Sequence, residues 1–242
     1  MLKTIILLCR HAEGQHLTGE KFSMKYGPSL TKAGAGQAYR RCVRQLKELN
    51  IIPDVILISP QLRAIQTTAF ARKNRRLLSD GKTILKDVPV EILPNAYEQT
   101  RLLAGQGNII PLFHKDQHAE KWKNETLMRN DRPLWKAVEN AFPLAQPKPD
   151  KNGSSQSRSR KILAHLEKNY KGKVVLLVCH DGIARDIISQ YTGVKNENVF
   201  DLVEIRNLNS YQRGTSRKKT TQSRRKNTCR KVTRNRRRQD LR

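Results

Sequence analysis

Three short, continuous apolar runs are the feature of this sequence that most constrains its fold. They cover Thr4 to Cys9, Asp54 to Ser59 and Lys173 to Cys179, and Val, Ile and Leu dominate each of them. Strands that are buried on both faces of a parallel sheet have this composition, whereas half-buried strands alternate between apolar and polar residues. The runs therefore predict buried strands of a parallel sheet.

Helical patterns lie between these runs, with apolar residues recurring on one face. They cover Thr31 to Leu49, Pro60 to Ala69, Ile162 to Leu166 and Ile183 to Tyr191, and a last strand is predicted at Phe200 to Arg206. Strands and helices thus alternate along the chain. This order predicts an α/β fold with three layers (αβα), in which helices cover both faces of a mainly parallel sheet.

The remaining segments predict how the chain is divided. Glycines and prolines interrupt Ala96 to Pro149, which predicts an inserted cap segment with a helix around Trp122 to Ala141. A polar loop, Pro147 to Arg160, is expected before the next helix. With 37% hydrophobic residues, the chain can bury one sizeable core. We therefore predict one catalytic domain at residues 1–212 and a disordered basic tail at residues 213–242.

The formal net charge of +27 is far from typical and is unevenly distributed. Residues 213–242 hold 14 Lys or Arg against one acid, Asp240, so about half of the charge lies in the tail. Such an excess predicts attraction to nucleic acid or another polyanion, with little sequence preference. The tail is equally consistent with a nuclear import signal, so we expect a cytoplasmic and/or nuclear location.

Cysteine spacing indicates the redox environment. Cys9, Cys42, Cys179 and Cys229 form no closely spaced pair. This argues against a zinc site and a disulfide framework, and it favours a reducing compartment. The first apolar run is too short for a signal segment or a membrane span, and no transmembrane segment is expected.

Unusual polar residues follow each apolar run directly. They are Arg10-His11, the segment Ser59 to Arg63, and His180-Asp181. Because the ligand site of a parallel sheet lies beyond the carboxyl ends of its strands, we expect these groups to converge. Arginine forks bind phosphate, and a neutral imidazole can attack phosphorus and form a phosphohistidine. The convergence therefore predicts a site for phosphoryl chemistry.

A leaving alkoxide also needs a proton, which either Glu98 or Asp181 could donate. His16 lies near Arg10-His11 in the sequence and is a candidate for contact with the substrate. No metal-ligand spacing joins the other histidines outside these motifs, and no nucleotide-binding glycine loop is present. We therefore expect no metal and no cofactor.

Four ordered motifs resemble those of the histidine phosphatase superfamily, which includes phosphoglycerate-mutase-like enzymes. They read LLCRHAEG, LTKAGAGQA (Leu30 to Ala38), SPQLRAIQTT (Ser59 to Thr68) and VVLLVCHDGIARDI (Val174 to Ile187). The resemblance spans residues 1–212 and implies a phosphatase.

The same resemblance implies roles for individual residues. His11 would be the phosphorylated residue, Arg10 and Arg63 would bind phosphate, and His180 would complete the pocket. Glu98 follows a proline-bearing strand, where the family keeps its acid, whereas Asp181 resembles the aspartate that donates the proton in the acid phosphatase branch.

The departures from the family also carry information. The segment Gly14-Gln15-His16-Leu17 lacks the asparagine that members often have there, and the substrate-recognition sequence of mutases is not visible between Leu17 and Ser29. We therefore predict metal-independent hydrolysis of a phosphomonoester on a small molecule or a phosphoprotein, with mutase activity disfavoured.

Two alternatives compete with this interpretation. Cys179, Gly182 and Arg185 form a C-x-x-G-x-x-R pattern between a strand and a helix, which is typical of cysteine phosphatases. The second alternative is a nucleic-acid-associated protein that acts through its basic tail.

Overall fold

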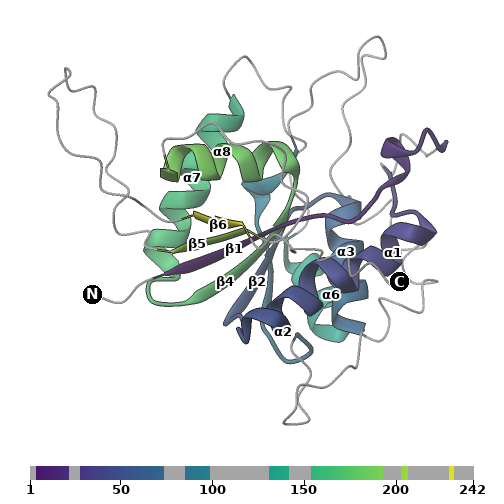
Figure 1. Cartoon of the computed structure of the whole chain (residues 1–242), viewed down its shortest axis with the longest axis horizontal. Coiled ribbons are helices and arrows are strands. Elements are labelled where there is room, and N and C mark those ends of the chain that lie inside the picture. Colours follow the sequence, from purple (N-terminus) through teal and green to yellow (C-terminus); the bar gives the residue numbers. More distant parts are fainter. Residues whose placement is uncertain are drawn as a thin grey trace, which may run out of the picture.

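The computed structural model describes residues 4–21, 28–73, 85–98, 131–141, 154–192, 203–206 and 229–231. Its strands form one sheet in the order β3-β2-β4-β1-β5-β6 (Figure 1). The parallel strands are β1 (Ile5–Arg10), β2 (Val55–Ile58), β3 (Val90–Ile92) and β4 (Val174–Cys179). Two antiparallel pairings continue the sheet, through β5 (Val203–Arg206) and β6 (Cys229–Lys231).

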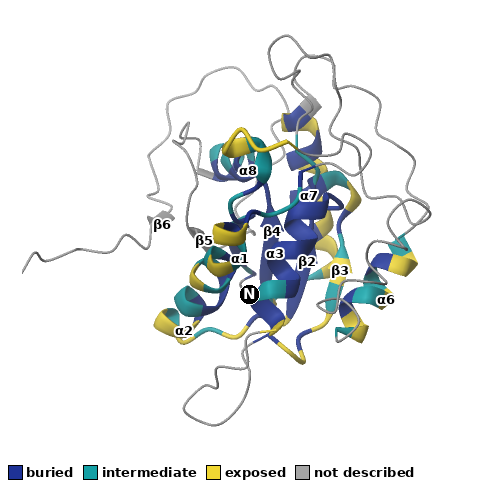
Figure 2. Cartoon of the chain, turned by 90° about the vertical axis from the view of Figure 1, so that its right-hand side faces the viewer, coloured by how far each residue is buried: buried dark blue, intermediate teal, exposed yellow. Residues whose placement is uncertain are grey.

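Helices cover both faces of this sheet (Figures 1 and 2). They are η1 (Gln15–Leu17), α1 (Lys32–Ala38), the π-helix η2 (Tyr39–Arg44), α2 (Gln45–Leu49), α3 (Leu62–Lys73), η3 (Pro94–Ala96), α6 (Arg132–Ala141), α7 (Ser154–Asn169) and α8 (Asp181–Thr192). None of the described helices is long and apolar enough to span a membrane. The predicted α/β class with a mainly parallel sheet is confirmed.

Alternation along the central strands separates two apolar cores. Leu7 and Cys9 of β1 face the core under η2, α2, α3 and α6, whereas Ile6 and Leu8 face the core under α7 and α8. Both sets are fully buried. The continuous apolar runs therefore have the composition predicted for strands covered on both faces.

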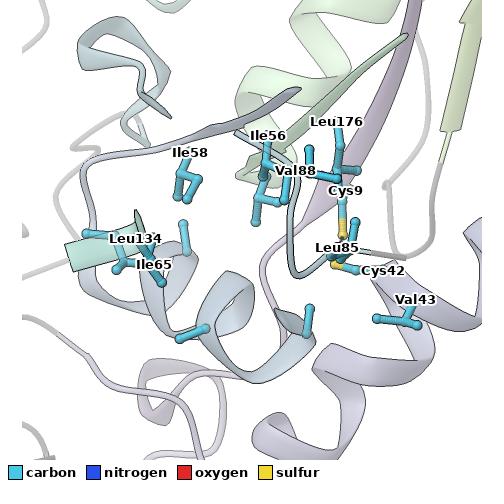
Figure 3. Packing of buried hydrophobic residues seen from close by; sticks show 14 of the residues in the cluster. Cys9, Cys42, Val43, Ile56, Ile58, Ile65, Leu85, Val88, Leu134 and Leu176 are labelled. Atoms are coloured by element: carbon cyan, nitrogen blue, oxygen red, sulfur yellow. Dashed lines mark hydrogen bonds between the residues drawn. The ribbon is translucent and has the colours of Figure 1, made fainter. Parts of the chain in front are cut away.

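Figure 3 shows the first of these cores, where Cys9 and Cys42 meet. Their Sγ atoms lie 2.9 Å apart, and both thiols are buried. The π-helix η2 carries Cys42 to this place, inside the region predicted as one helix from Thr31 to Leu49. The Thr31 side chain caps α1 by accepting a hydrogen bond from the Gly34 N–H (2.9 Å), at the start of the predicted helical region.

One expectation about the remaining segments needs correction. The polar loop expected at Pro147 to Arg160 is helical from Ser154 onward, because Arg158 and Ser159 are buried by tertiary packing despite their polar character. Within residues 213–242 the structure describes β6, whose backbone pairs with β5. The rest of the tail, and most of the cap expected at Ala96 to Pro149, lie outside the described residues.

Candidate active site

The carboxyl ends of three central strands lie at one edge of the sheet. Arg10 is in register with Cys179, and Ile58 with Val178. The pairing continues one residue further, because the His11 N–H donates to the Cys179 carbonyl and the Ser59 N–H to the Val178 carbonyl, both at 2.9 Å. The polar residues that follow the three apolar runs therefore lie together at this edge, as predicted.

His11 is 1% exposed and has a defined protonation pattern. Its Nδ1 lies 2.6 Å from the Ala12 carbonyl oxygen, which can only accept, so we assign the ring proton to Nδ1. The lone pair on Nε2 then accepts a hydrogen bond from Arg63 Nε at 3.0 Å. His11 Nε2 is thus unprotonated and lies against Arg63. A lone pair on this nitrogen is what an attack on phosphorus requires.

Arg63, also 1% exposed, connects the other site residues. Its Nη2 donates to Gln61 Oε1 (3.3 Å), to the Glu98 carboxylate, and to His180 Nδ1 (3.1 Å). Since His180 Nδ1 accepts, its Nε2 carries the proton and donates to Ser59 Oγ at 2.7 Å. One guanidinium therefore joins both histidines and a carboxylate in a buried cluster.

Burial is the main cause of the shifted pKa values of the three clustered histidines. Desolvation and then the charge of Arg63 hold the pKa of His11 and of His180 well below the usual range. The same causes lower the pKa of His16 to about 3. The ring of His11 lies 5.0 Å from that of His180 and 5.6 Å from that of His16, measured between centroids. Neutral imidazoles are therefore available at working pH.

The two candidate proton donors have different surroundings. Glu98, 26% exposed at its side chain, pairs with Arg63 and lies 3.7 Å from His180 Nδ1. Asp181, at the start of α8, pairs with Arg185 on its own helix at 2.8 Å. Both carboxylates lie close enough to Arg10 to affect its pKa. Desolvation lowers the pKa of Arg10, and the negative charges of Asp181 and Glu98 raise it. Glu98 thus lies against both Arg63 and His180.

Comparison with known proteins agrees with this geometry. Residues 6–89 match the model of the histidine phosphatase superfamily, branch 1. This part of the chain is therefore similar to the histidine phosphatase superfamily. The resemblance predicted from the motifs is confirmed. A comparison with curated protein sequences gives no match.

Solved structures share the histidine phosphatase fold at low sequence identity. The ecdysone phosphate phosphatase of Bombix mori is 13% identical, with a TM-score of 0.55 over 92% of this chain and 97% of that one. A putative alpha-ribazole-5'-P phosphatase of Escherichia coli is 22% identical, with a TM-score of 0.50 over 84% and 90% of the two chains. The phosphoserine phosphatase of Entamoeba histolytica is 16% identical, with the same TM-score and coverage.

Supporting residues of the candidate site escaped the sequence analysis. Arg41 Nη1 donates to the His11 carbonyl at 2.8 Å, and Thr31 Oγ1 donates to Glu13 Oε1 at 2.7 Å. A Cβ on Gly34 would lie 2.1 Å from the Glu13 carbonyl oxygen, so α1 can approach the His11 loop closely only with glycine there. The motif LTKAGAGQA contains Thr31 and Gly34 and was the available signal.

The surroundings of Cys179 contradict the cysteine-phosphatase alternative. Cys179 is fully buried in the apolar core under α7 and α8. Desolvation is the first cause that raises the pKa of its thiol, so the side chain stays a thiol instead of the thiolate that attacks phosphorus. Arg185, the arginine of the pattern, is paired with Asp181.

One group of potential metal ligands occurs among the described residues. Ligand atoms of His11, His16 and Glu98 lie within 4.8 Å of one another. Two arginines, Arg10 and Arg63, act on the same groups, and His11 Nε2 already accepts from Arg63. Positive charge at this place favours an anion over a cation.

Proposed function

We propose that the chain hydrolyses phosphomonoesters through a phosphohistidine at His11 Nε2, without a metal ion. The observation that carries the proposal is the protonation pattern of His11, whose Nδ1 is bound to the Ala12 carbonyl while Nε2 points its lone pair at Arg63. The match of residues 6–89 to the model of the histidine phosphatase superfamily supports phosphatase activity.

In the first step, oxygens of the substrate phosphate bind Arg10 and Arg63, whose forked N–H groups suit three equatorial oxygens. The hydrogen bonds that Arg63 makes to described residues come from Nε and Nη2, and we assign Nη1 to the phosphate. His11 Nε2 then attacks phosphorus, and the bond between phosphorus and the ester oxygen breaks. The Ala12 carbonyl, which accepts from Nδ1–H, stabilises the positive charge that the ring gains.

Glu98 is the proposed donor of the proton that the departing alkoxide takes up. In this structure its carboxylate pairs with Arg63. A bound phosphate dianion would compete for that arginine, and an anion beside Glu98 favours the protonated carboxyl. In the second step, Glu98 accepts a proton from water as the water oxygen attacks phosphorus, which releases inorganic phosphate and restores His11. Asp181 remains the alternative donor.

We propose a phosphorylated small molecule as the substrate. The three structural neighbours are named for phosphatases of three different phosphate esters. A common phosphate site with a variable leaving-group region accounts for such a range. His16, neutral and beside His11, is our candidate for contact with the substrate.

The test is hydrolysis of 4-nitrophenyl phosphate, with a chelator present, by the wild type, His11→Ala and Cys179→Ser. We expect His11→Ala to lose about 10³-fold or more, because the nucleophile is removed, and Cys179→Ser to keep its activity. Rapid denaturation during turnover should trap a phosphoryl group on the peptide that contains His11. Undiminished activity of His11→Ala would refute the phosphohistidine, and loss of wild-type activity on chelation would refute metal independence.

A further inference from the structure

Glu98 must be held near the phosphate if it is to protonate a leaving group. The segment Pro94 to Glu98 leaves the sheet edge through η3 and offers little regular structure of its own. Two buried side chains from elsewhere in the chain bind this segment, and the proposed mechanism uses neither of them.

Gln61 holds the backbone of the segment from the α3 side. Its Oε1 accepts from the Glu98 N–H at 2.9 Å and from Arg63 Nη2 at 3.3 Å. Because both partners are donors, the amide oxygen must face them, which defines the orientation of the buried amide. Gln61 therefore ties the backbone of the candidate acid to the arginine that binds phosphate.

Arg158 holds the segment from α7. This side chain is 4% exposed. Its guanidinium carbon lies 3.9 Å from the centre of the Tyr97 ring, and its Nη2 donates to the Tyr97 carbonyl at 3.3 Å. A cation over an aromatic face and a hydrogen bond to the same residue restrict both its ring and its backbone. Tyr97 directly precedes Glu98, so this restriction bears on the carboxylate.

We propose that Gln61 and Arg158 are positioning residues for Glu98, which together keep its carboxyl where the ester oxygen departs. The inference rests on the proposed function and deepens it. A carboxyl displaced by about 1 Å transfers its proton poorly and costs on the order of 10²-fold in rate. The loss of rate should be larger for a substrate whose leaving group is a weaker acid, because such a group needs a proton to depart.

The experiment compares kcat/KM for two probes of similar shape, phenyl phosphate and 4-nitrophenyl phosphate. Phenol is a much weaker acid than 4-nitrophenol, so only phenyl phosphate depends strongly on a proton donor. We expect Gln61→Met and Arg158→Met to slow phenyl phosphate about tenfold to a hundredfold more than 4-nitrophenyl phosphate. Arg158→Lys, which keeps a cation over Tyr97, should restore part of the ratio.

Arg160→Met is the matched control, because Arg160 is an exposed arginine on the same helix. It should leave the ratio unchanged. An equal loss on both probes in Gln61→Met and Arg158→Met, or no loss, would overturn the positioning role, because general structural damage does not discriminate between leaving groups.

Glu98→Gln separates this inference from the proposed function. It should shift the ratio at least as far as the positioning variants do. If Glu98→Gln leaves the ratio unchanged, the assignment of the proton donor is wrong. A wild type that hydrolyses neither probe would overturn the proposed function and the inference with it.

Discussion

The two ends of helix α3 each bury an arginine, and their surroundings differ. Arg72, near the carboxyl end, binds both oxygens of Asp131, at 2.6 and 3.1 Å. It also donates to the carbonyls of Leu85, Lys86 and Val88. Arg63, near the amino end, shares one nitrogen among Gln61, Glu98 and His180.

This contrast shows that a buried charge does not by itself mark an active site. Arg72 binds both oxygens of one carboxylate and three backbone carbonyls. These partners belong to different chain segments, so Arg72 holds those segments together. Arg63 is surrounded by groups that can attack phosphorus or exchange protons, and desolvation lowers its pKa. The nature of the partners distinguishes a structural arginine from a phosphate-binding one.

Arg63→Met should produce the largest effect, on activity. The loss of a charged fork that stabilises phosphoryl transfer costs on the order of 10³-fold or more in kcat/KM. The assay is hydrolysis of 4-nitrophenyl phosphate, with Arg72→Met as the comparison. Activity of Arg63→Met within tenfold of the wild type would remove Arg63 from the proposed phosphate site.

Arg72→Met should instead lower stability. It leaves the Asp131 carboxylate and three carbonyls without their donor, which costs about 3–5 kcal/mol of unfolding free energy. Urea unfolding measures this loss, and the folded fraction should keep its kcat/KM. A stable Arg72→Met protein with impaired catalysis would contradict the structural role of Arg72 and its contrast with Arg63.

A smaller effect concerns pH, and it belongs to the Arg63 end. Burial holds the pKa of His11 and His180 well below the unfolded value, so both stay neutral in the folded state while the unfolded chain takes up protons. Their stabilising contribution is present above the unfolded pKa of about 6.5 and is lost as the pH falls below it. Urea unfolding at pH 7.5 and 5.0 checks this.

The matched variant for the pH experiment is His180→Gln, which removes one of the two buried titrating groups. The stability of this variant should fall less between pH 7.5 and 5.0 than that of the wild type. An identical fall in both proteins would show that His180 is not kept neutral by the fold.

Much of the site could be predicted from the sequence, because each strand is recognised from a short continuous stretch of residues. The runs that end at Cys9, Ser59 and Cys179 predict where each chain segment meets the sheet edge, and the next residues of each run do meet there. The contact between Glu98 and Arg63 was not accessible, because the two residues lie 35 positions apart in the sequence.

The positioning residues were missed for the same reason. Gln61 stands inside the recognised motif SPQLRAIQTT, but its partner is the backbone of a residue 37 positions later. Arg158 lies in a stretch rich in Ser and Arg that predicted a loop, and only packing shows that it is buried against Tyr97, 61 positions away.

The amino-acid sequence by itself determined the buried strands, the α/β class and the meeting of arginines and histidines at the strand ends. These properties follow from local composition and from the geometry that all parallel sheets share. The tertiary structure alone decided that Cys179 is an inert thiol, that the histidines are neutral and that Glu98 faces Arg63. Desolvation and contacts between distant segments govern these properties, and they exist only once the chain has folded.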